Sequence, residues 1–368
     1  MIIQSSIQAV KDRMDVVDVI SQFVKLDRNN SGLCPFHNEK SPSFHVTAKR
    51  QTYKCFGCGD GGDAIHFLME HEKMDFMQAI EWLANRYNVT LEYLKEDDSA
   101  KQKREEAKDH ARVMLDAVQF AYRRYQTNLL NTARDNGPAW NYLLNTRQFK
   151  EVTAIVWGFG HAPDEWQFLS SAAINAGHYE AALKTGMVKT NDGKTFDFYR
   201  NRLIIPIHNI NGHIIGIAGR WIPTGDEEKD KSQAKYFNPQ DSLIYQKSKV
   251  LFGLYQALTA KAFAKGKDGS STPAFFVEGY MDVISMHESG FMNTVSGCGT
   301  AITLDQVRLT KRYTDHFIVF TDGDTAGMKA ALKFIDMCLQ ENVRTEVIEL
   351  PEGEDPDSYI KKYSLTTA

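Results

Sequence analysis

Two short cysteine-containing segments constrain the fold of this chain more than any other feature. The first is Cys34-Pro35-Phe36-His37, and the second, Cys55-Phe56-Gly57-Cys58, follows after seventeen residues. Two residues between the members of each pair is the spacing of zinc knuckles, whose turns direct backbone amides at the sulfurs. Because four ligands complete a tetrahedral site, we expect one structural zinc ion, held by Cys34, His37, Cys55 and Cys58.

The residues around these knuckles predict a small zinc ribbon. Strand-like runs at 43–46 and 52–54 form a hairpin between the knuckles, and Asp63 is placed to cap the helix that follows. Lysines and arginines alternate here with aromatic residues, a composition that lets a small sheet follow a phosphate backbone and stack the bases of single-stranded DNA. The alternative is that the aromatics form the core of the ribbon, and this is what we expect for Phe36 and Phe56.

Composition narrows the class of protein. A chain of 368 residues is long enough for two or three domains. Three of its five cysteines belong to the knuckles, which argues against a disulfide framework and favours the cytoplasm. A net charge of −4 is unlike a protein that simply coats nucleic acid. No apolar run approaches the ~20 residues that span a bilayer, so we expect no membrane partner.

The carboxyl-terminal third of the chain repeats a strand–loop–helix pattern. The predicted strands lie near 275–277, 294–295, 317–320 and 344–350. Such alternation is typical of a parallel sheet with right-handed crossovers. Acidic residues follow three of the strands, at the edge of the sheet where α/β proteins bind their ligands. They are Glu278 and Asp282, Asp322 and Asp324, and Asp355 and Asp357.

These carboxylates together predict a metal site. The Asp-Gly-Asp turn after the third strand would, by itself, be an ordinary acidic turn. Carboxylates brought together from several strands repel one another unless a cation neutralises them, and their oxygens suit Mg²⁺ or Mn²⁺ better than zinc. The expected direct ligands are Asp322, Asp324 and one or both of Asp355 and Asp357. We expect Glu278 to act as general acid/base or as a further ligand, and Asp282 as a supporting carboxylate.

Several segments of this sequence resemble a known family. CPFHNEKSPSFHV and YKCFGCGDGGDAIHFLME, around the knuckles, are similar to the zinc-binding domain of bacterial DnaG-type primases. The order of the acidic residues resembles a Toprim domain, a metal-binding fold shared by these primases, type IA and type II topoisomerases and some nucleases. The resemblance extends in order over residues 30–360.

The middle of the chain resembles the same family. Apolar runs at 202–207 and 213–220 flank Asn211-Gly212 and predict a β-hairpin, whereas Gly158–Pro163 is expected to be a turn. The segments NRLIIPI, IAGR and KYFNP, and then a lysine ahead of LFGLYQA, follow the order found in these primases. Each basic residue taken singly could be only a surface charge. As an ordered set, they imply a groove for template and nucleotide phosphates, lined by Arg147, Arg202, Arg220, Lys235 and Lys247.

The resemblance implies a multidomain protein with α+β and α/β parts. The expected domains are a zinc-ribbon DNA-binding domain at 1–95, a charged and partly helical linker at 96–112, a basic subdomain of a primase catalytic core at 113–271, and a Toprim subdomain, a parallel sheet flanked by helices, at 272–368.

The implied activity is DNA-dependent synthesis of RNA primers for DNA replication. A single-stranded DNA template and ribonucleoside triphosphates are the implied partners, together with the replicative helicase and single-strand-binding protein. The alternatives are a Toprim nuclease or topoisomerase, or a non-catalytic zinc-ribbon adaptor that binds DNA. The complete set of acidic residues argues against the adaptor.

The carboxyl end departs from the family pattern. Primases of this family continue into a helicase-binding domain, whereas this chain ends about ten residues after Asp357. It is therefore expected to be a fragment or a short primase encoded by a phage or mobile element. Helicase binding through such a domain is not predicted.

Overall fold

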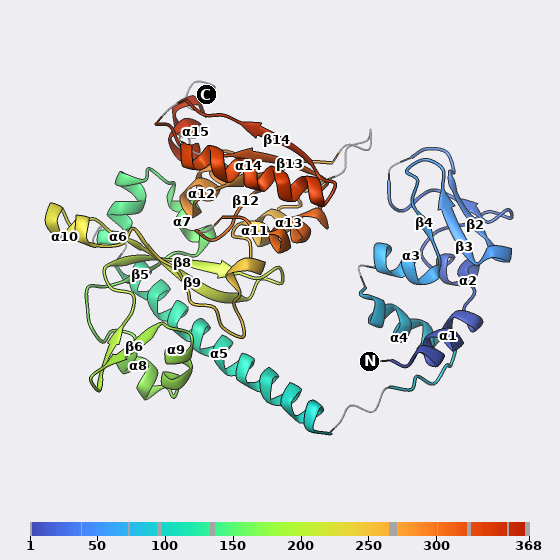
Figure 1. Cartoon of the computed structure of the whole chain (residues 1–368), viewed down its shortest axis with the longest axis horizontal. Helices are drawn as coiled ribbons and strands as arrows, with labels where there is room; N and C mark the ends of the chain where they lie inside the picture. The colour runs from blue at the N-terminus through green and yellow to red at the C-terminus, as the bar shows by residue number, and fades with distance from the viewer. Residues whose placement is uncertain are drawn as a thin grey trace. The chain divides into compact units, whose positions relative to one another are not determined.

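The chain folds into two compact units. The computed structural model describes residues 2–37, 39–72, 74–93, 98–132, 137–264, 271–299, 301–321, 325–351 and 353–364. Described residues up to Arg104 belong to the first unit, and those from Glu105 onward belong to the second (Figure 1). No helix in these ranges is both long and apolar enough to cross a membrane.

The predicted charged linker is largely helical. Residues 98–112 begin the 34-residue helix α5 (Asp98–Asn131). Lys, Glu, Gln and Ala, which dominate this segment, all favour helix. Farther along, Ala121, Tyr125 and Leu129 are spaced four residues apart and are buried, so packing stabilises the carboxyl-terminal half of the helix.

The first unit is a four-stranded antiparallel zinc ribbon with helices. Its strands are β1 (Ser31–Gly32), β2 (Phe44–Thr47), β3 (Thr52–Cys55) and β4 (Gly61–Gly62), and its helices are α1 (Gln4–Arg13), α2 (Val16–Ile20), α3 (Ala64–His71) and α4 (Phe76–Arg86). The predicted hairpin is confirmed, with Phe44 paired to Cys55 and Thr47 to Thr52. Asp63 caps α3 as predicted, because its carboxylate accepts from the His66 amide.

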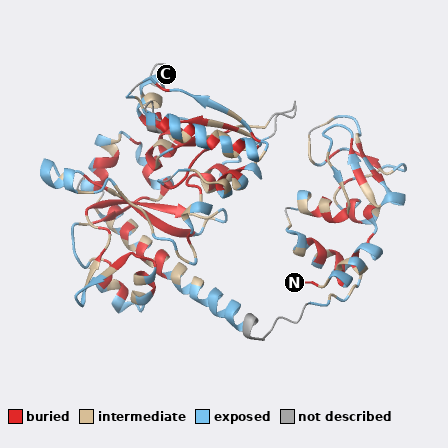
Figure 2. Cartoon of the chain, in the orientation of Figure 1, coloured by how far each residue is buried: buried red, intermediate tan, exposed pale blue. Residues whose placement is uncertain are grey.

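The amino-terminal part of the second unit is built on a sheet in the order β10-β9-β8-β5. The predicted hairpin is confirmed as β8 (Arg202–His208) and β9 (Ile214–Trp221), whose residues are almost all buried (Figure 2). The remaining strands are β5 (Gly160–Ala162) and β10 (Tyr236–Phe237), with β6 (Val188–Asn191) and β7 (Lys194–Asp197) as a separate hairpin. The helices are α6 (Pro138–Asn141), η3 (Tyr142–Thr146), α7 (Glu151–Trp157), α8 (Ser170–Asn175), α9 (Tyr179–Lys184), α10 (Glu227–Ser232), η4 (Lys247–Lys249) and α11 (Leu254–Thr259).

The predicted turn at Gly158–Pro163 is wrong at its centre, where β5 pairs with β8. A strand of three residues has no periodicity to detect, and its partner lies about forty residues away. Gly160 faces α5, where a Cβ would lie 2.9 Å from the Tyr125 Cβ. The glycine that suggests a turn instead lets the strand approach the helix closely.

The carboxyl-terminal part of the second unit is the predicted parallel sheet, in the order β12-β11-β13-β14. Its strands are β11 (Ala274–Val277), β12 (Thr294–Ser296), β13 (His316–Phe320) and β14 (Arg344–Ile348). The helices between and after them are α12 (Tyr280–Glu288), α13 (Leu304–Lys311), α14 (Thr325–Gln340) and α15 (Pro356–Ser364). All four predicted strands are confirmed, and their carboxyl ends lie at one edge of the sheet because the strands run in the same direction.

Three histidines, of which His161 and His287 are buried and His208 is partly buried, make the second unit sensitive to acid. Burial lowers the pKa of His161, His208 and His287 to about 4. A histidine in the unfolded chain has a pKa near 6.5. Between pH 6.5 and 4 the unfolded chain therefore binds more protons than the folded chain. Stability is therefore lost as the pH falls through that window.

We expect His287→Gln to lose less stability than the parent chain when the pH falls from 7.5 to 5. The difference should be about 1–2 kcal/mol, since one proton-linked penalty is removed. Urea unfolding followed by Trp fluorescence measures it, because the Trp157 ring lies 5.1 Å from His287. His110→Gln, at an exposed position on α5, is the control. Equal pH dependence in all three proteins would contradict the prediction for His287.

Candidate functional site

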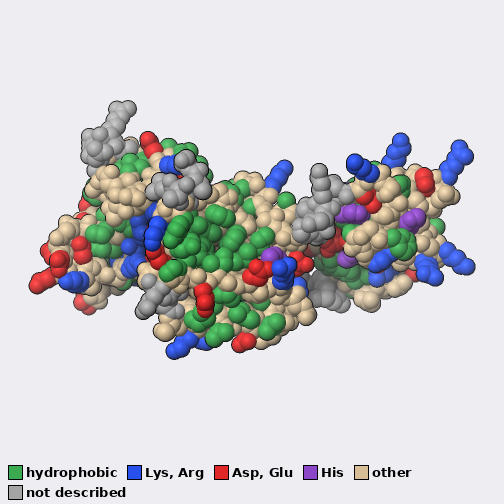
Figure 3. Space-filling model, turned by 90° about the horizontal axis from the view of Figure 1, so that it is seen from above, with side chains coloured by type: hydrophobic (Ala, Val, Ile, Leu, Met, Phe, Trp, Pro, Cys, Tyr) green, Lys and Arg blue, Asp and Glu red, His purple; other side chains and the backbone are tan. Residues whose placement is uncertain are grey.

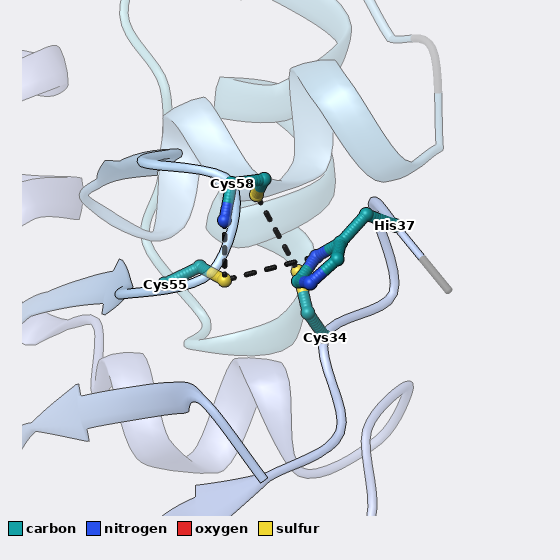
Figure 4. Close-up of side chains that lie close together, drawn as sticks. All are labelled: Cys34, His37, Cys55 and Cys58. Atoms are coloured by element: carbon teal, nitrogen blue, oxygen red, sulfur yellow. Dashed lines mark hydrogen bonds between the residues drawn. The ribbon is translucent and has the colours of Figure 1, made fainter. Parts of the chain in front are cut away.

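The four predicted zinc ligands come together in the first unit. The Sγ atoms of Cys34 and Cys58 are 3.9 Å apart, and Cys55 Sγ lies 3.8 Å from His37 Nδ1 (Figure 4). All four ligand atoms lie within 4.8 Å of one another. A tetrahedral zinc ion with bonds of about 2.3 Å requires ligand separations near 3.8 Å. The donor set and its spacing therefore fit zinc.

Backbone amides of both knuckles support the thiolates. The Phe36 amide donates to Cys34 Sγ at 3.4 Å, and the Gly57 and Cys58 amides donate to Cys55 Sγ at 3.3 and 3.4 Å. Burial raises the pKa of the Cys34 thiol to about 12. A cation must therefore displace a tightly held proton there, which makes metal binding weaken in acid.

The expectation that Phe56 belongs to the ribbon core is wrong. Phe36 does pack against the core, but the Phe56 side chain is 74% exposed. Its ring contacts His45 edge-to-face at 5.4 Å, and His45 pairs across the strands with exposed Lys54. The knuckle turn places Phe56 outside because Cys55 on one side of it points inward to the cluster. Lys and Arg side chains extend from this unit on the face drawn in Figure 3.

In the second unit, a cavity of about 810 Å³ opens at the carboxyl edge of the parallel sheet. Four of the six predicted acidic residues line it: Glu278, Asp282, Asp355 and Asp357. Glu278 directly follows β11 and is exposed. Asp282 accepts from the Gly279 amide at 2.8 Å, and Asp355 accepts from the Ser358 amide at 2.7 Å, so each also caps the start of a helix.

The predicted ligands Asp322 and Asp324 lie outside the described residues. Thr321, the last described residue before them, follows β13 and lines the cavity. Among the described residues, the knuckle cluster is the only group of three or more His, Cys, Asp or Glu whose ligand atoms lie close enough for one metal ion. The described carboxylates share the cavity without converging on one point.

Asp357 differs from the other carboxylates. It is buried and contacts two cations, Arg147 Nη1 at 2.9 Å and Lys361 Nζ at 2.6 Å. Ser285 on α12 also donates its hydroxyl to Asp357. Because its charge is already balanced, Asp357 does not fit the expected role of a direct metal ligand. Asp355, two residues earlier and exposed, fits that role better.

The five predicted basic residues occupy four different kinds of position. Arg147 and Lys235 line the cavity. Arg220 lies over the ring of Tyr236, which lines the cavity, and no described residue pairs with its buried Nε and Nη1 atoms. Lys247 is held by its backbone, whose amide donates to Asp241 and whose carbonyl accepts from Gln306, and it is absent from the cavity lining.

Arg202, the fifth predicted basic residue, is buried in the sheet and is not among the residues that line the cavity, so its expected phosphate contact stays a prediction. Arg202 is 1% exposed and donates from Nη1 to the carbonyls of Gly219 and Ala234. Its guanidinium stacks on Phe237 at 3.5 Å. Burial lowers its pKa to about 10. Arg202 therefore joins β9 to the segment before β10 through Nη1, whereas no described residue pairs with its buried Nη2 atom.

Two further features were missed from the sequence. Tyr236 and Asn238, from the KYFNP segment, line the cavity, and Tyr280 donates to Asn238 Oδ1 at 2.9 Å. That contact joins the middle of the chain to the parallel sheet. Elsewhere in the unit, Arg200 stacks on Trp166 at 3.3 Å, and Trp166 is 60% exposed. The sequence offered only a Trp within the polar run Asp164–Gln167 and an Arg just before the NRLIIPI segment, with nothing to connect the two.

Comparisons with known proteins cover both units. Three family models match: the CHC2 zinc finger over residues 2–99, the N-terminal domain of the DNA primase catalytic core over 124–258, and a Toprim-like domain over 275–360.

The individual relatives and solved structures agree with these family matches. DNA primases of Clostridium acetobutylicum and Synechococcus elongatus are each 36% identical over 98% of this chain. The chain spans about half the length of these relatives, 57% and 51%. The Aquifex aeolicus primase structure (zinc-binding and RNA polymerase domains) is 31% identical with a TM-score of 0.59, over 98% of this chain and 83% of that one. A DnaG primase catalytic domain bound to single-stranded DNA is 27% identical, with a TM-score of 0.60. The match covers 69% of this chain and 78% of that one.

Proposed function

Because the chain belongs to the bacterial DnaG-type DNA primase family, we propose that it synthesises short RNA primers from ribonucleoside triphosphates on a single-stranded DNA template. The observation that carries this proposal is the shared cavity. Carboxylates from the Toprim-like sheet and cations from the middle of the chain line the same 810 Å³ space. Phosphoryl transfer needs both kinds of group at one place.

The proposed reaction joins a primer 3′-hydroxyl to the α-phosphorus of the incoming nucleotide, and pyrophosphate leaves. We assign Glu278 as the base that accepts the hydroxyl proton, since it is exposed at the end of β11. Lys235 is assigned to the triphosphate, whose negative charge it would balance, and Arg147, whose Nη1 pairs with Asp357, would contribute its further guanidinium donors. Arg220 is assigned a similar role, because no described residue pairs with its buried Nε and Nη1 atoms and a buried donor left in this state favours an anionic partner.

We further assign a divalent cation, Mg²⁺ or Mn²⁺, to the acidic residues of the cavity and of the TDGD segment. Asp355 would hold it together with Asp322 and Asp324, while Glu278 remains available as the base. When bound, the cation would neutralise charge on the phosphates and lower the pKa of the attacking hydroxyl. The zinc at the knuckles is assigned a structural role, because its four ligands leave no open position.

The single-stranded template is assigned to exposed aromatic residues with cations beside them. Phe56 with Lys54 in the first unit, and Trp166 with Arg200 in the second, each offer a ring for base stacking and a charge for the backbone. The related primase domain solved with single-stranded DNA supports this choice of template. Single-strand-binding protein and the replicative helicase, which act on the same template, are the further proposed partners. The proposed location of the reaction is the cytoplasm.

We expect Phe56→Ala to weaken binding of a single-stranded oligonucleotide about 5- to 100-fold, the effect of losing one stacked base. Fluorescence anisotropy with a labelled oligonucleotide measures the change. Phe76→Ala is the matched control, since Phe76 is 40% exposed in the same unit and follows the N-cap of α4. Equal affinity of the Phe56→Ala and parent proteins would show that template binds elsewhere.

The function is tested by incubating the chain with single-stranded DNA and labelled ribonucleotides in Mg²⁺ or Mn²⁺. Short RNA products, resistant to DNase and dependent on the template, are the expected result. Cleavage of the DNA without RNA products would instead identify a Toprim nuclease. Binding of DNA with neither product would identify the non-catalytic adaptor. Adding single-strand-binding protein or helicase to the same assay tests whether either changes the product yield.

A further inference from the structure

A carboxylate that is not one of the four clustered ligands lies beside the knuckle cluster. Glu39 follows the first knuckle by two residues, and its side chain is 10% exposed. Its Oε2 atom lies 3.2 Å from Nε2 of His37. The other ring nitrogen of His37, Nδ1, is the one that faces Cys55 Sγ at 3.8 Å.

This geometry assigns the two nitrogens of the His37 ring different tasks. Nδ1 can bind a metal only if it carries no proton, so the ring proton must reside on Nε2. A carboxylate next to Nε2 stabilises that proton position and fixes the orientation of the ring. We propose that Glu39 is a positioning residue that holds His37 in its zinc-binding tautomer and thereby sets the zinc affinity of the ribbon.

Glu39 is itself held in place by groups from both sides of the first knuckle. Its Oε1 atom accepts from the Cys34 amide at 2.7 Å and from the Ser43 amide at 3.2 Å. Its Oε2 atom accepts from the Ser43 hydroxyl. Ser43 Oγ also lies 3.2 Å from Cys55 Sγ. One carboxylate thus connects ligands of the first knuckle to a ligand of the second.

The second knuckle encloses this contact from the opposite side. A Cβ on Gly57 would lie 2.6 Å from His37 Nε2 and 2.9 Å from Ser43 Oγ. Gly57 has a backbone conformation open to other residues, so the lack of a side chain serves close approach and not a special φ angle. Gly57→Ala is therefore expected to displace the same ring that Glu39 holds.

Glu39→Gln tests the proposal. The substitution keeps the size of the side chain, but both oxygens of Glu39 accept hydrogen bonds, so the amide NH₂ must face a donor on one side. We expect zinc affinity, measured by competition with a chromogenic chelator, to fall about 10- to 100-fold. Gly57→Ala should lower it as well.

The control is a second His–Glu pair in the same unit. Glu72 lies 2.8 Å from His71 Nδ1, and His71 is not one of the four clustered ligands. Glu72→Gln should leave zinc affinity unchanged. An equal loss in Glu39→Gln and Glu72→Gln would indicate a general effect on stability and would overturn the proposal. So would an unchanged affinity in Glu39→Gln.

A second measurement separates positioning of His37 from general stability. In ¹H–¹⁵N spectra of the zinc-loaded protein, the parent chain should show a slowly exchanging proton on His37 Nε2. That proton should exchange quickly in Glu39→Gln and remain protected in Glu72→Gln. The proposal rests on zinc at the knuckles, which is tested separately: the parent chain should carry about one zinc, and Cys55→Ser should lose it. Absence of zinc from the parent would overturn the metal assignment, whereas zinc with unchanged affinity in Glu39→Gln would overturn only the role of Glu39.

Discussion

Glu278→Gln should reduce primer synthesis about 10²- to 10⁴-fold, the usual effect of removing a general acid or base. The substitution retains the shape of the side chain but removes both the proton acceptor and a negative charge from the cavity edge. Yield of labelled RNA on single-stranded DNA measures the loss. Because Glu278 is exposed beyond the end of β11, the unfolding free energy should change little.

The matched control for Glu278 is Glu341→Gln. Glu341 belongs to the same half of the second unit, pairs with Arg308 at 2.8 Å, and is absent from the cavity lining. Its substitution should leave priming within about twofold of the parent, as for most surface changes. Full primer synthesis by Glu278→Gln would remove Glu278 from the reaction and shift the role of base to another carboxylate of the cavity.

Asp357→Asn should destabilise the second unit by about 2 kcal/mol or more. The substitution leaves Arg147 and Lys361 near each other without the carboxylate that balances them, and removing one partner of a buried ion pair is costly. Urea unfolding measures the effect. Glu354→Gln, which breaks an ion pair with the exposed Lys362, is the control and should change stability little.

A double-mutant cycle with Arg147→Met distinguishes the two possible roles of Asp357. If the ion pair is structural, the two substitutions together should destabilise less than the sum of their separate effects. If Asp357 instead binds the divalent cation, Asp357→Asn should leave stability intact and raise the Mg²⁺ concentration needed for half-maximal priming. That second pattern would restore Asp357 to the expected ligand set.

The zinc ribbon could be predicted from sequence because its information is local. Cys34 and His37, and Cys55 and Cys58, each lie within one turn of chain, and a metal ion allows few arrangements of four ligands. The strands of the parallel sheet were also predictable, since short apolar runs alternate with helical segments. These signals place Glu278 and Asp355 at the ends of elements, and the structure brings both to one cavity.

The roles of single charged and aromatic residues could not be predicted in the same way. Arg202 begins β8 and Arg220 is next to last in β9 of the same hairpin, yet only Arg202 is fully buried. Whether Phe56 faces the core or solvent depends on the path of one knuckle turn. A sequence pattern records residue type and spacing, while burial depends on which distant segments cover a position.

The cluster of Cys34, His37, Cys55 and Cys58 and the strands of the parallel sheet could be predicted from the sequence, because they depend on near neighbours in the chain and on short apolar runs. The pairing of Asp357 with Arg147, 210 residues away, and the position of Glu39 between His37 and Ser43 follow only from the folded chain. A carboxylate has the same charge in any sequence context. What it does depends on the cations and donors that folding brings to it, and those come from parts of the chain that no local pattern connects.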